Sequence, residues 1–130
     1  MANQIKAIHA LRPRIKMGPT VQMNELTDFM AGRTGLSKGS IRLVLAELQE
    51  AIVFYAQQGR GVKLEGLGTY LPNVRLNGEV NIQHRQSPEF KRALNQERFA
   101  GTIINRKHMG KTPAQLLALW NELHPEDMVE

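Results

Sequence analysis

The stretch that decides the fold is residues 59–70, GRGVKLEGLGTY, in which four positions are glycine. A glycine loop that cradles a phosphate follows a strand and opens a helix. Here the glycines follow a predicted helix and lead into a predicted strand, and no Lys-Ser or Lys-Thr pair follows Gly66 or Gly68. The order therefore favours backbone corners, in which Gly59 ends the helix and Gly61 allows a turn. Gly66 and Gly68 then form a corner or a bulge between two strand segments.

Two helices are predicted before this glycine stretch. The first runs over residues 23–33 and has a narrow apolar face, with Gln22 or Asn24 as its N-cap. The second starts after Ser37, a standard N-cap, and continues to about residue 58. Its apolar stripe is longer than one short helix can cover, so it needs a second large apolar surface, such as a sheet or another subunit. The residues of this stripe are Ile41, Val44, Leu45, Leu48, Ile52 and Tyr55.

A β-hairpin and a short helix are predicted after the glycine stretch. From residue 62 onward apolar and charged side chains alternate, which is the period of a strand. Asn77-Gly78 predicts a tight type I′ turn, and residues 79–85 return as the second strand of the hairpin. Ser87-Pro88 then begins a helix, because serine is a favoured N-cap and proline is favoured at the first helical position.

Both ends of the chain add elements to this arrangement. Residues 4–11 alternate and predict a short strand, and a basic loop follows it. Residues 102–105 predict another strand, and a leucine-rich helix follows Thr112-Pro113. Trp120 lies within that helix, where a packing role is favoured over stacking on a nucleic-acid base. We therefore expect three segments: a strand and basic loop over 1–21, a main domain over 22–95, and an extension over 96–130 whose strand and helix pack on that domain.

The charge of the chain is positive and unevenly distributed. The sequence holds 17 Lys and Arg against 12 Asp and Glu, which gives a formal net charge of +5. Residues 1–20 carry bases and no acid, whereas residues 122–130 carry acids and no base. A basic balance permits nucleic-acid binding without establishing it. The acidic end is expected to shield a basic surface or to face a partner.

The sequence contains no pattern for catalysis or for a bound metal. It has no cysteine, which excludes disulfides and thiolate metal sites, and its 4 histidines are dispersed without HExxH spacing. No G-x-S-x-G motif and no paired carboxylates occur. No window approaches the ~20 apolar residues of a membrane span, and no signal-like run opens the chain. We expect a cytoplasmic protein that is not an enzyme and that has no cofactor, metal, small-molecule substrate or membrane association.

The order of these elements, together with three short motifs, resembles the HU/IHF family of bacterial nucleoid DNA-binding proteins. The motifs are GLS at 35–37 before the long helix, VKLEGLGTY at 62–70, and SPEFKRAL at 87–94. Leu67 and Tyr70 occupy places where the family usually has phenylalanine. The resemblance covers about residues 22–95 and implies an α+β fold. In this fold two N-terminal helices pack on a small antiparallel sheet, a β-hairpin arm projects, and a short helix closes the domain.

Three features depart from the family pattern. The arm ends in the compact stretch RLNGEV, and Pro72 lies at its base, whereas the family often carries a proline near the tip that wedges between base pairs. The closing helix is two residues longer from Pro88 to Leu94 and lacks the family's Pro-Gly step. Residues 1–21 and 96–130 have no counterpart in short members, and an N-terminal strand is similar to extended HU-like proteins of some bacteria.

The resemblance implies an intertwined homodimer in the nucleoid, with the apolar stripe of the second helix in the dimer core. Its two sheets form a saddle that binds double-stranded DNA through phosphates and the minor groove, largely without sequence preference. The basic side chains lack the Asn and Gln partners that are typical of base-edge contacts. The candidate DNA contacts are Lys63, Arg75, Arg85, Lys91 and Arg92.

Two questions stay open at this point. A second basic set, Arg98, Arg106, Lys107 and Lys111, either extends the DNA surface or, as we favour, only keeps the added strand soluble. The chain as a whole is either a DNA binder or an HU-like protein-interaction module with reduced or lost DNA binding. In the second case residues 112–130 dock onto another protein or extend the dimer. The short arm and the acidic end favour the module, and the net charge and basic hairpin favour DNA.

Overall fold

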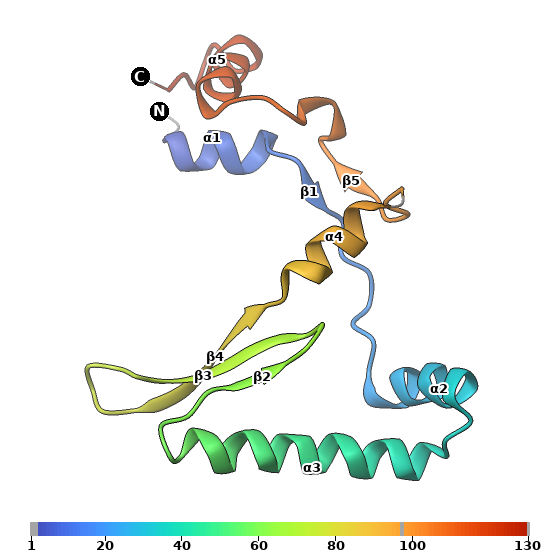
Figure 1. Cartoon of the computed structure of the whole chain (residues 1–130). Helices are drawn as coiled ribbons and strands as arrows, with labels where there is room; N and C mark the ends of the chain where they lie inside the picture. Colours follow the sequence, from blue (N-terminus) through green and yellow to red (C-terminus); the bar gives the residue numbers. More distant parts are fainter. Residues whose placement is uncertain (1–2, 97, 130) are drawn as a thin grey trace. The chain divides into compact units, whose positions relative to one another are not determined.

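The computed structural model describes residues 3–96 and 98–129 and divides the chain into two compact units. The central unit is Thr20–Phe99, and the terminal unit combines Met1–Pro19 with Ala100–Glu130. Figure 1 shows how the first and last segments of the chain meet in the terminal unit. Each unit is described separately below. Packing of residues 96–130 on the 22–95 domain stays a prediction.

The central unit begins with the two predicted helices, which the structure confirms. Helix α2 (Met23–Thr34) follows Gln22 and ends at Gly35, whose left-handed backbone (φ 76°) donates its N–H to Ala31 O. Helix α3 (Lys38–Ala56) starts after Ser37, whose side-chain oxygen accepts a hydrogen bond from the N–H of Ser40. This bond satisfies one of the backbone donors that a helix start leaves unpaired.

A three-stranded antiparallel sheet follows α3, in the order β2-β3-β4, and a closing helix follows the sheet. Gly66 (φ 82°) lies in the turn between β2 and β3 and confirms the predicted corner. Gly68 (φ 141°) has a stricter reason to be glycine, because a Cβ there would collide with the backbone carbonyl of Arg85 on β4. The elements are β2 (Val62–Leu64), β3 (Gly68–Val74), β4 (Val80–Gln86) and α4 (Pro88–Gln96).

The turn at the tip of the hairpin is not the predicted type I′ turn. Arg75 N–H donates to Glu79 O at 2.9 Å and Gly78 N–H donates to Arg75 O at 2.9 Å, so the loop has three residues. Gly78 has positive φ (89°) but Asn77 does not, whereas type I′ requires it at both positions. The reason is register. Val74 pairs with Val80, and a two-residue turn would shift the pairing by one residue and move every side chain to the other face.

The terminal unit starts with a helix, which corrects the predicted strand over residues 4–11. Helix α1 (Gln4–Leu11) is capped by Asn3, whose side-chain oxygen accepts from the N–H of Lys6 at 2.7 Å. The helix places Ala7 and Leu11, four residues apart, on one face, where both are buried. Strand β1 (Arg14–Ile15) lies within the predicted basic loop and pairs with β5 (Ile103–Ile104), which confirms the strand predicted over 102–105.

Helix α5 (Pro113–Leu123) completes the terminal unit and packs on α1. It begins with a capping box, in which the Thr112 and Gln115 side chains each accept from the other residue's backbone N–H. Trp120 is 6% exposed, which confirms its packing role. Its indole N–H donates to Asp127 O at 2.8 Å and thereby holds the following segment against the helix. The core of this unit consists of Ala7, Leu11, Leu116, Trp120 and Val129.

The central unit, in contrast, has almost no core of its own. Among its described residues, Ile41 is the one apolar side chain that is buried. On α2 and α3 large apolar side chains are open to solvent, including Phe29 (62% exposed) and Val44 (61% exposed). Burial of one such side chain contributes about 1.5–3 kcal/mol. A single copy of this unit therefore leaves most of its available hydrophobic stabilisation unused.

We expect the Asp127→Asn variant to be less stable than the wild type at neutral pH only. Lys6 Nζ lies 3.2 Å from Asp127 Oδ2, and its hydrogen bond lowers the pKa of that carboxyl below the usual 3.8. A carboxyl whose pKa is lower in the folded state than in the unfolded state stabilises the fold at pH values above the unfolded-state pKa. This stabilisation is lost as the pH falls through the folded-state pKa. Trp120, the single tryptophan, reports the thermal midpoint of this unit by fluorescence at pH 7 and at pH values well below 3.8.

Glu126→Gln is the matched control, since it removes one exposed negative charge beside Asp127. The difference in thermal midpoint between D127N and the wild type should disappear at the lowest pH. The thermal midpoint of E126Q should match that of the wild type at every pH. A difference of the same size at every pH would contradict this assignment.

Candidate nucleic-acid interface

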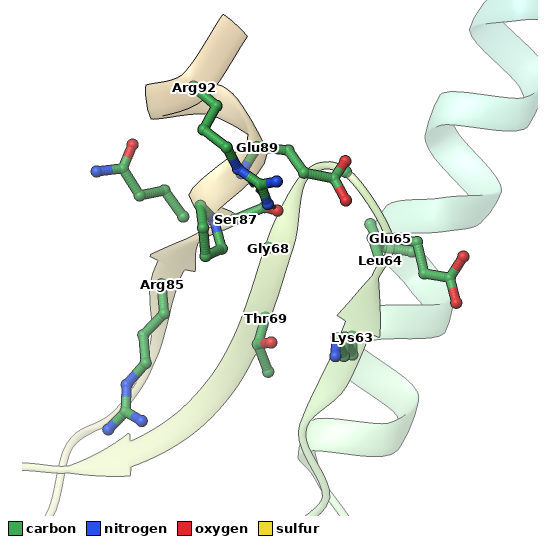
Figure 2. A pocket seen from close by; sticks show the side chains of 12 residues that line it. Lys63, Leu64, Glu65, Gly68, Thr69, Arg85, Ser87, Glu89 and Arg92 are labelled. Atoms are coloured by element: carbon green, nitrogen blue, oxygen red, sulfur yellow. Dashed lines mark hydrogen bonds between the residues drawn. The ribbon is translucent and has the colours of Figure 1, made fainter.

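The candidate site is a cleft in the central unit between the sheet and the start of α4. It has a volume of about 470 Å³ and receives residues from β2, the following turn, β3, β4 and α4. Three of the predicted DNA contacts, Lys63, Arg85 and Arg92, line it. Figure 2 shows Lys63 and Arg85 on their strands and Arg92 on the helix.

Strand register explains why two of these bases lie on one face of the sheet. Lys63 on β2 is opposite Thr69 on β3, and Thr69 is opposite Arg85 on β4. Residues directly opposite each other in an antiparallel sheet project to the same side. Lys63, Thr69 and Arg85 therefore form one row across three strands, with the small threonine between the two bases (Figure 2).

The neighbouring positions form the other face of the sheet, which is apolar and turns toward α3. Val62, Tyr70 and His84 make the adjacent row, and the Tyr70 and His84 rings lie 4.7 Å apart. A groove between this face and the helix is lined by Leu45, Leu48, Ile52, Tyr70 and Ile82, among others. Because side chains alternate, the contact of this face with α3 leaves the Lys63 row on the opposite side.

The polar face continues along the hairpin toward Arg75. On β3 the alternate positions after Thr69 are Leu71 and Asn73, and Arg75 extends this series at the loop. Asn73 is opposite Asn81, and Leu71 is opposite Gln83. Asn and Gln side chains thus share the face with Arg75 and Arg85. The expectation that the bases lack such partners is wrong. Alternation along each strand already places Asn73 on the side of Arg75, and Asn81 and Gln83 on the side of Arg85. The register then brings the two sets onto one face.

The start of α4 closes the other side of the cleft. Ser87 N–H donates to Leu67 O at 3.1 Å, which fixes the helix start to the turn between β2 and β3. The Ser87 hydroxyl accepts from Glu89 N–H at 3.3 Å, as an N-cap does. Arg92 lies one turn into the helix and reaches the cleft, whereas Lys91, the residue before it, is not among the lining residues.

The bases of the cleft are not neutralised by the acids beside them. Glu65 and Glu89 also line the cleft. Within the described part of the chain, however, no ion pair joins either acid to Lys63, Arg85 or Arg92. These three cations can therefore bind an external anion without first breaking an internal pair.

Sequence reasoning found the basic residues of this cleft but missed its acidic and uncharged ones. Thr69, Ser87 and the amides Asn73, Asn81 and Gln83 are members of the polar face or of the cleft. For the amides, the signal is the alternation of side chains along residues 79–85. It identifies their face only if the hairpin loop is taken to have three residues instead of two. Within the described residues, no group of His, Asp and Glu is arranged to hold a metal ion. None of the described helices is long and apolar enough to cross a membrane.

Comparisons with known proteins bear on the family. A family model described as an HU domain fused to a wHTH, Ig or glycine-rich motif (HU-HIG) matches residues 2–94, more than half of the chain. This match confirms the predicted resemblance to HU-like proteins. A solved structure of an HU mutant from Thermotoga maritima has a TM-score of 0.49 and 20% identity, and it covers 58% of this chain and 100% of that one. No curated protein matches.

We expect Gly68→Ala to destabilise the protein more than Gly59→Ala. Both glycines have positive φ, which costs an L-residue about 1 kcal/mol. At Gly59 an added methyl group meets no atom within 4 Å, whereas at Gly68 it meets the Arg85 carbonyl, so β4 must move. Thermal midpoints of the two variants measure the difference. Equal destabilisation would show that the approach of β4 at Gly68 is not constrained in this way.

Proposed function

The chain belongs to the HU-HIG family, and we propose that it is an architectural protein that binds double-stranded DNA as a homodimer. The observation that carries the proposal is the polar face of the β2-β3-β4 sheet. On it Lys63 and Arg85, which make no ion pair with any described residue, form one row, and Arg75 extends the same face along the hairpin. Arg92 adds a base from α4. Lys91 is the remaining candidate contact, on the same helix.

A second copy is the partner that best fits the uncovered apolar surface of the central unit. The stripe predicted for the dimer core includes Ile41, which is buried, and Val44 and Tyr55, which are exposed. Leu45, Leu48 and Ile52 are half-buried and line the open groove beside the sheet. Two identical apolar faces can cover each other around a twofold axis, which gives each unit the core it lacks.

On this proposal the sheet binds the DNA backbone and the hairpin enters the minor groove. Lys and Arg neutralise phosphates and release counterions, which makes binding tolerant of sequence and sensitive to salt. Arg75 and Arg85 are accompanied by Asn73, Asn81 and Gln83, and side chains of these types read the width and the limited code of the minor groove. Since the tip of the hairpin has no proline, we propose a shallow bend instead of a sharp kink by intercalation.

The second candidate is an HU-like protein-interaction module with reduced or lost DNA binding. The exposed apolar side chains of α2 and α3, such as Phe29 and Phe54, favour it. Docking through residues 112–130 is less favoured than the sequence suggested, because Leu116 and Trp120 already pack against α1 in the same chain. A partner of such a module would then use the central unit.

DNA binding is tested by titration with a random-sequence duplex of about 30 base pairs at several salt concentrations. We expect log K to fall linearly with log salt, with a slope of about −0.9 per phosphate contact. Arg75→Gln/Arg85→Gln should weaken binding at least tenfold at about 0.1 M salt and flatten the slope, because two contacts are removed from each chain. The control R33Q/R60Q removes the same charge from the last turn of α2 and from the segment between α3 and β2. Binding that is absent or independent of salt would support the interaction module instead.

Dimerisation is tested by light scattering at micromolar concentration. We expect twice the chain mass of 14.7 kDa. Val44→Asp should give the single-chain mass, because it places a charge in the proposed interface at a position that is exposed within one chain. Ala46→Asp, which adds the same charge about 200° around α3 by helical geometry, is the control. A wild type with the single-chain mass would rule out the dimer.

A further inference from the structure

The terminal unit has a cluster of basic side chains at one of its ends. We call it the terminal basic surface, and all its members are exposed. Its neighbourhood lacks opposing charge, because residues 3–19 and 100–121, all of them described, include no Asp or Glu. The members are Arg12, Arg14, Lys16, Arg106, Lys107 and Lys111.

Hydrogen bonds between the two ends of the chain hold this surface together. Strand β1 pairs with β5, and Lys16 N–H extends the pairing by donating to Thr102 O at 2.9 Å. The Asn105 side-chain amide donates to Ala10 O at 2.8 Å and to Arg12 O at 3.2 Å. Residues of the first segment are thereby fixed beside residues about 90 positions later in the chain.

The 3₁₀ helix η1 (Arg106–His108) is fixed by its own contacts. His108 is 5% exposed, and its Nδ1 lies 2.6 Å from Leu11 O, so this nitrogen donates to the last residue of α1. Asn105, just before η1, has a left-handed backbone (φ 60°) and is the one described residue other than glycine with positive φ. With His108 buried, Arg106 and Lys107 remain exposed beside Arg12. The surface is therefore built on a rigid support.

The segment after α5, which carries acidic residues, is held by contacts of its own. Asp127 pairs with Lys6 at 3.2 Å, and Asn121 exchanges two hydrogen bonds with the backbone of Val129. The segment after α5 is thus fixed along that helix. Figure 1 shows β1 and β5 at one end of the terminal unit and the start of α1 at the other. Asp127 thus pairs with a base outside the terminal basic surface, and shielding of a basic surface by the acidic segment stays a prediction.

We infer that the terminal basic surface is a second DNA-binding surface, which contacts phosphates of the same duplex that the central unit binds. This inference rests on the proposed function of the central unit. The chain passes from one unit to the other at two places, residues 19–20 and 99–100, so two covalent connections join the units. Once the central unit is bound, they keep the terminal unit at a high effective concentration near the DNA backbone. Exposed Lys and Arg side chains without acidic neighbours bind phosphates without regard to sequence.

The variant Arg12→Gln/Lys16→Gln/Arg106→Gln/Lys107→Gln tests this inference in the full-length protein. None of these four side chains makes a hydrogen bond or an ion pair in the described structure, so the terminal unit should stay folded. Trp120 fluorescence checks this. With the duplex of about 30 base pairs, we expect the salt slope to become shallower by about 0.9 for each lost contact, up to about 3.6 per chain. Affinity at about 0.1 M salt should fall at least tenfold.

The matched control is Arg33→Gln/Lys38→Gln/Arg42→Gln/Arg60→Gln, which removes four charges from α2, from α3 and from the segment between α3 and β2. Both variants lower the formal net charge from +5 by four, to +1. A slope that changes in the terminal variant and not in the control supports the inference. An unchanged slope, or an equal change in both variants, overturns it while the proposed function of the central unit stands. If the wild type itself does not bind DNA with a salt dependence, the proposed function fails, and this inference fails with it.

Discussion

The approach of β4 to β3 at Gly68 is the constraint on which the candidate site depends. No side chain fits between the two backbones there, and the contact fixes a register in which Gly68 is opposite Gln86. From that pair outward, every odd-numbered residue of β3 shares a face with an odd-numbered residue of β4. This register places Thr69 beside Arg85 and sends Tyr70 toward α3. A shift of one residue would place Thr69 and Arg85 on opposite faces and so separate Lys63 from Arg85, which makes the arrangement of the bases depend on this one register.

Local signals were sufficient to predict most elements of the central unit. Ser37 and Ser87 mark helix starts, and the alternation from residue 62 marks a strand, because each signal acts within a few residues of the structure it specifies. The prediction over residues 4–11 was wrong because those eight residues alternate weakly and also place Ala7 and Leu11 at helical spacing. Burial against α5, more than a hundred residues away, decides between the two, and a local pattern does not contain that contact.

The candidate site was predicted in its charges and not in its arrangement. Lys63, Arg85 and Arg92 could be identified as exposed bases near a glycine corner, and the structure brings all three to one cleft. The amides of the hairpin were missed as a group, because whether the two strands put them on one face depends on whether the loop has two or three residues. Asn77-Gly78 is a strong signal for the shorter loop, but the register set at Gly68 requires the longer one. Tertiary pairing thus overrides the local turn preference.

The two units differ in how they bury their apolar side chains, and the difference agrees with their proposed roles. The terminal unit closes its core within one chain, because α1 and α5 come from opposite ends of the sequence and cover each other. Its exposed surface is therefore free to be charged, and residues 3–19 and 100–121 carry bases and no acid. The central unit leaves much of the apolar surface of α2 and α3 exposed within one chain, and in the proposed function a partner surface covers it. If that partner is a second copy, every base on the sheet and on the terminal unit is duplicated by the same association. Folding and the assembly of a DNA-binding surface would then be one thermodynamic event, since the interaction that supplies the missing core also sets the number of cations that meet the duplex.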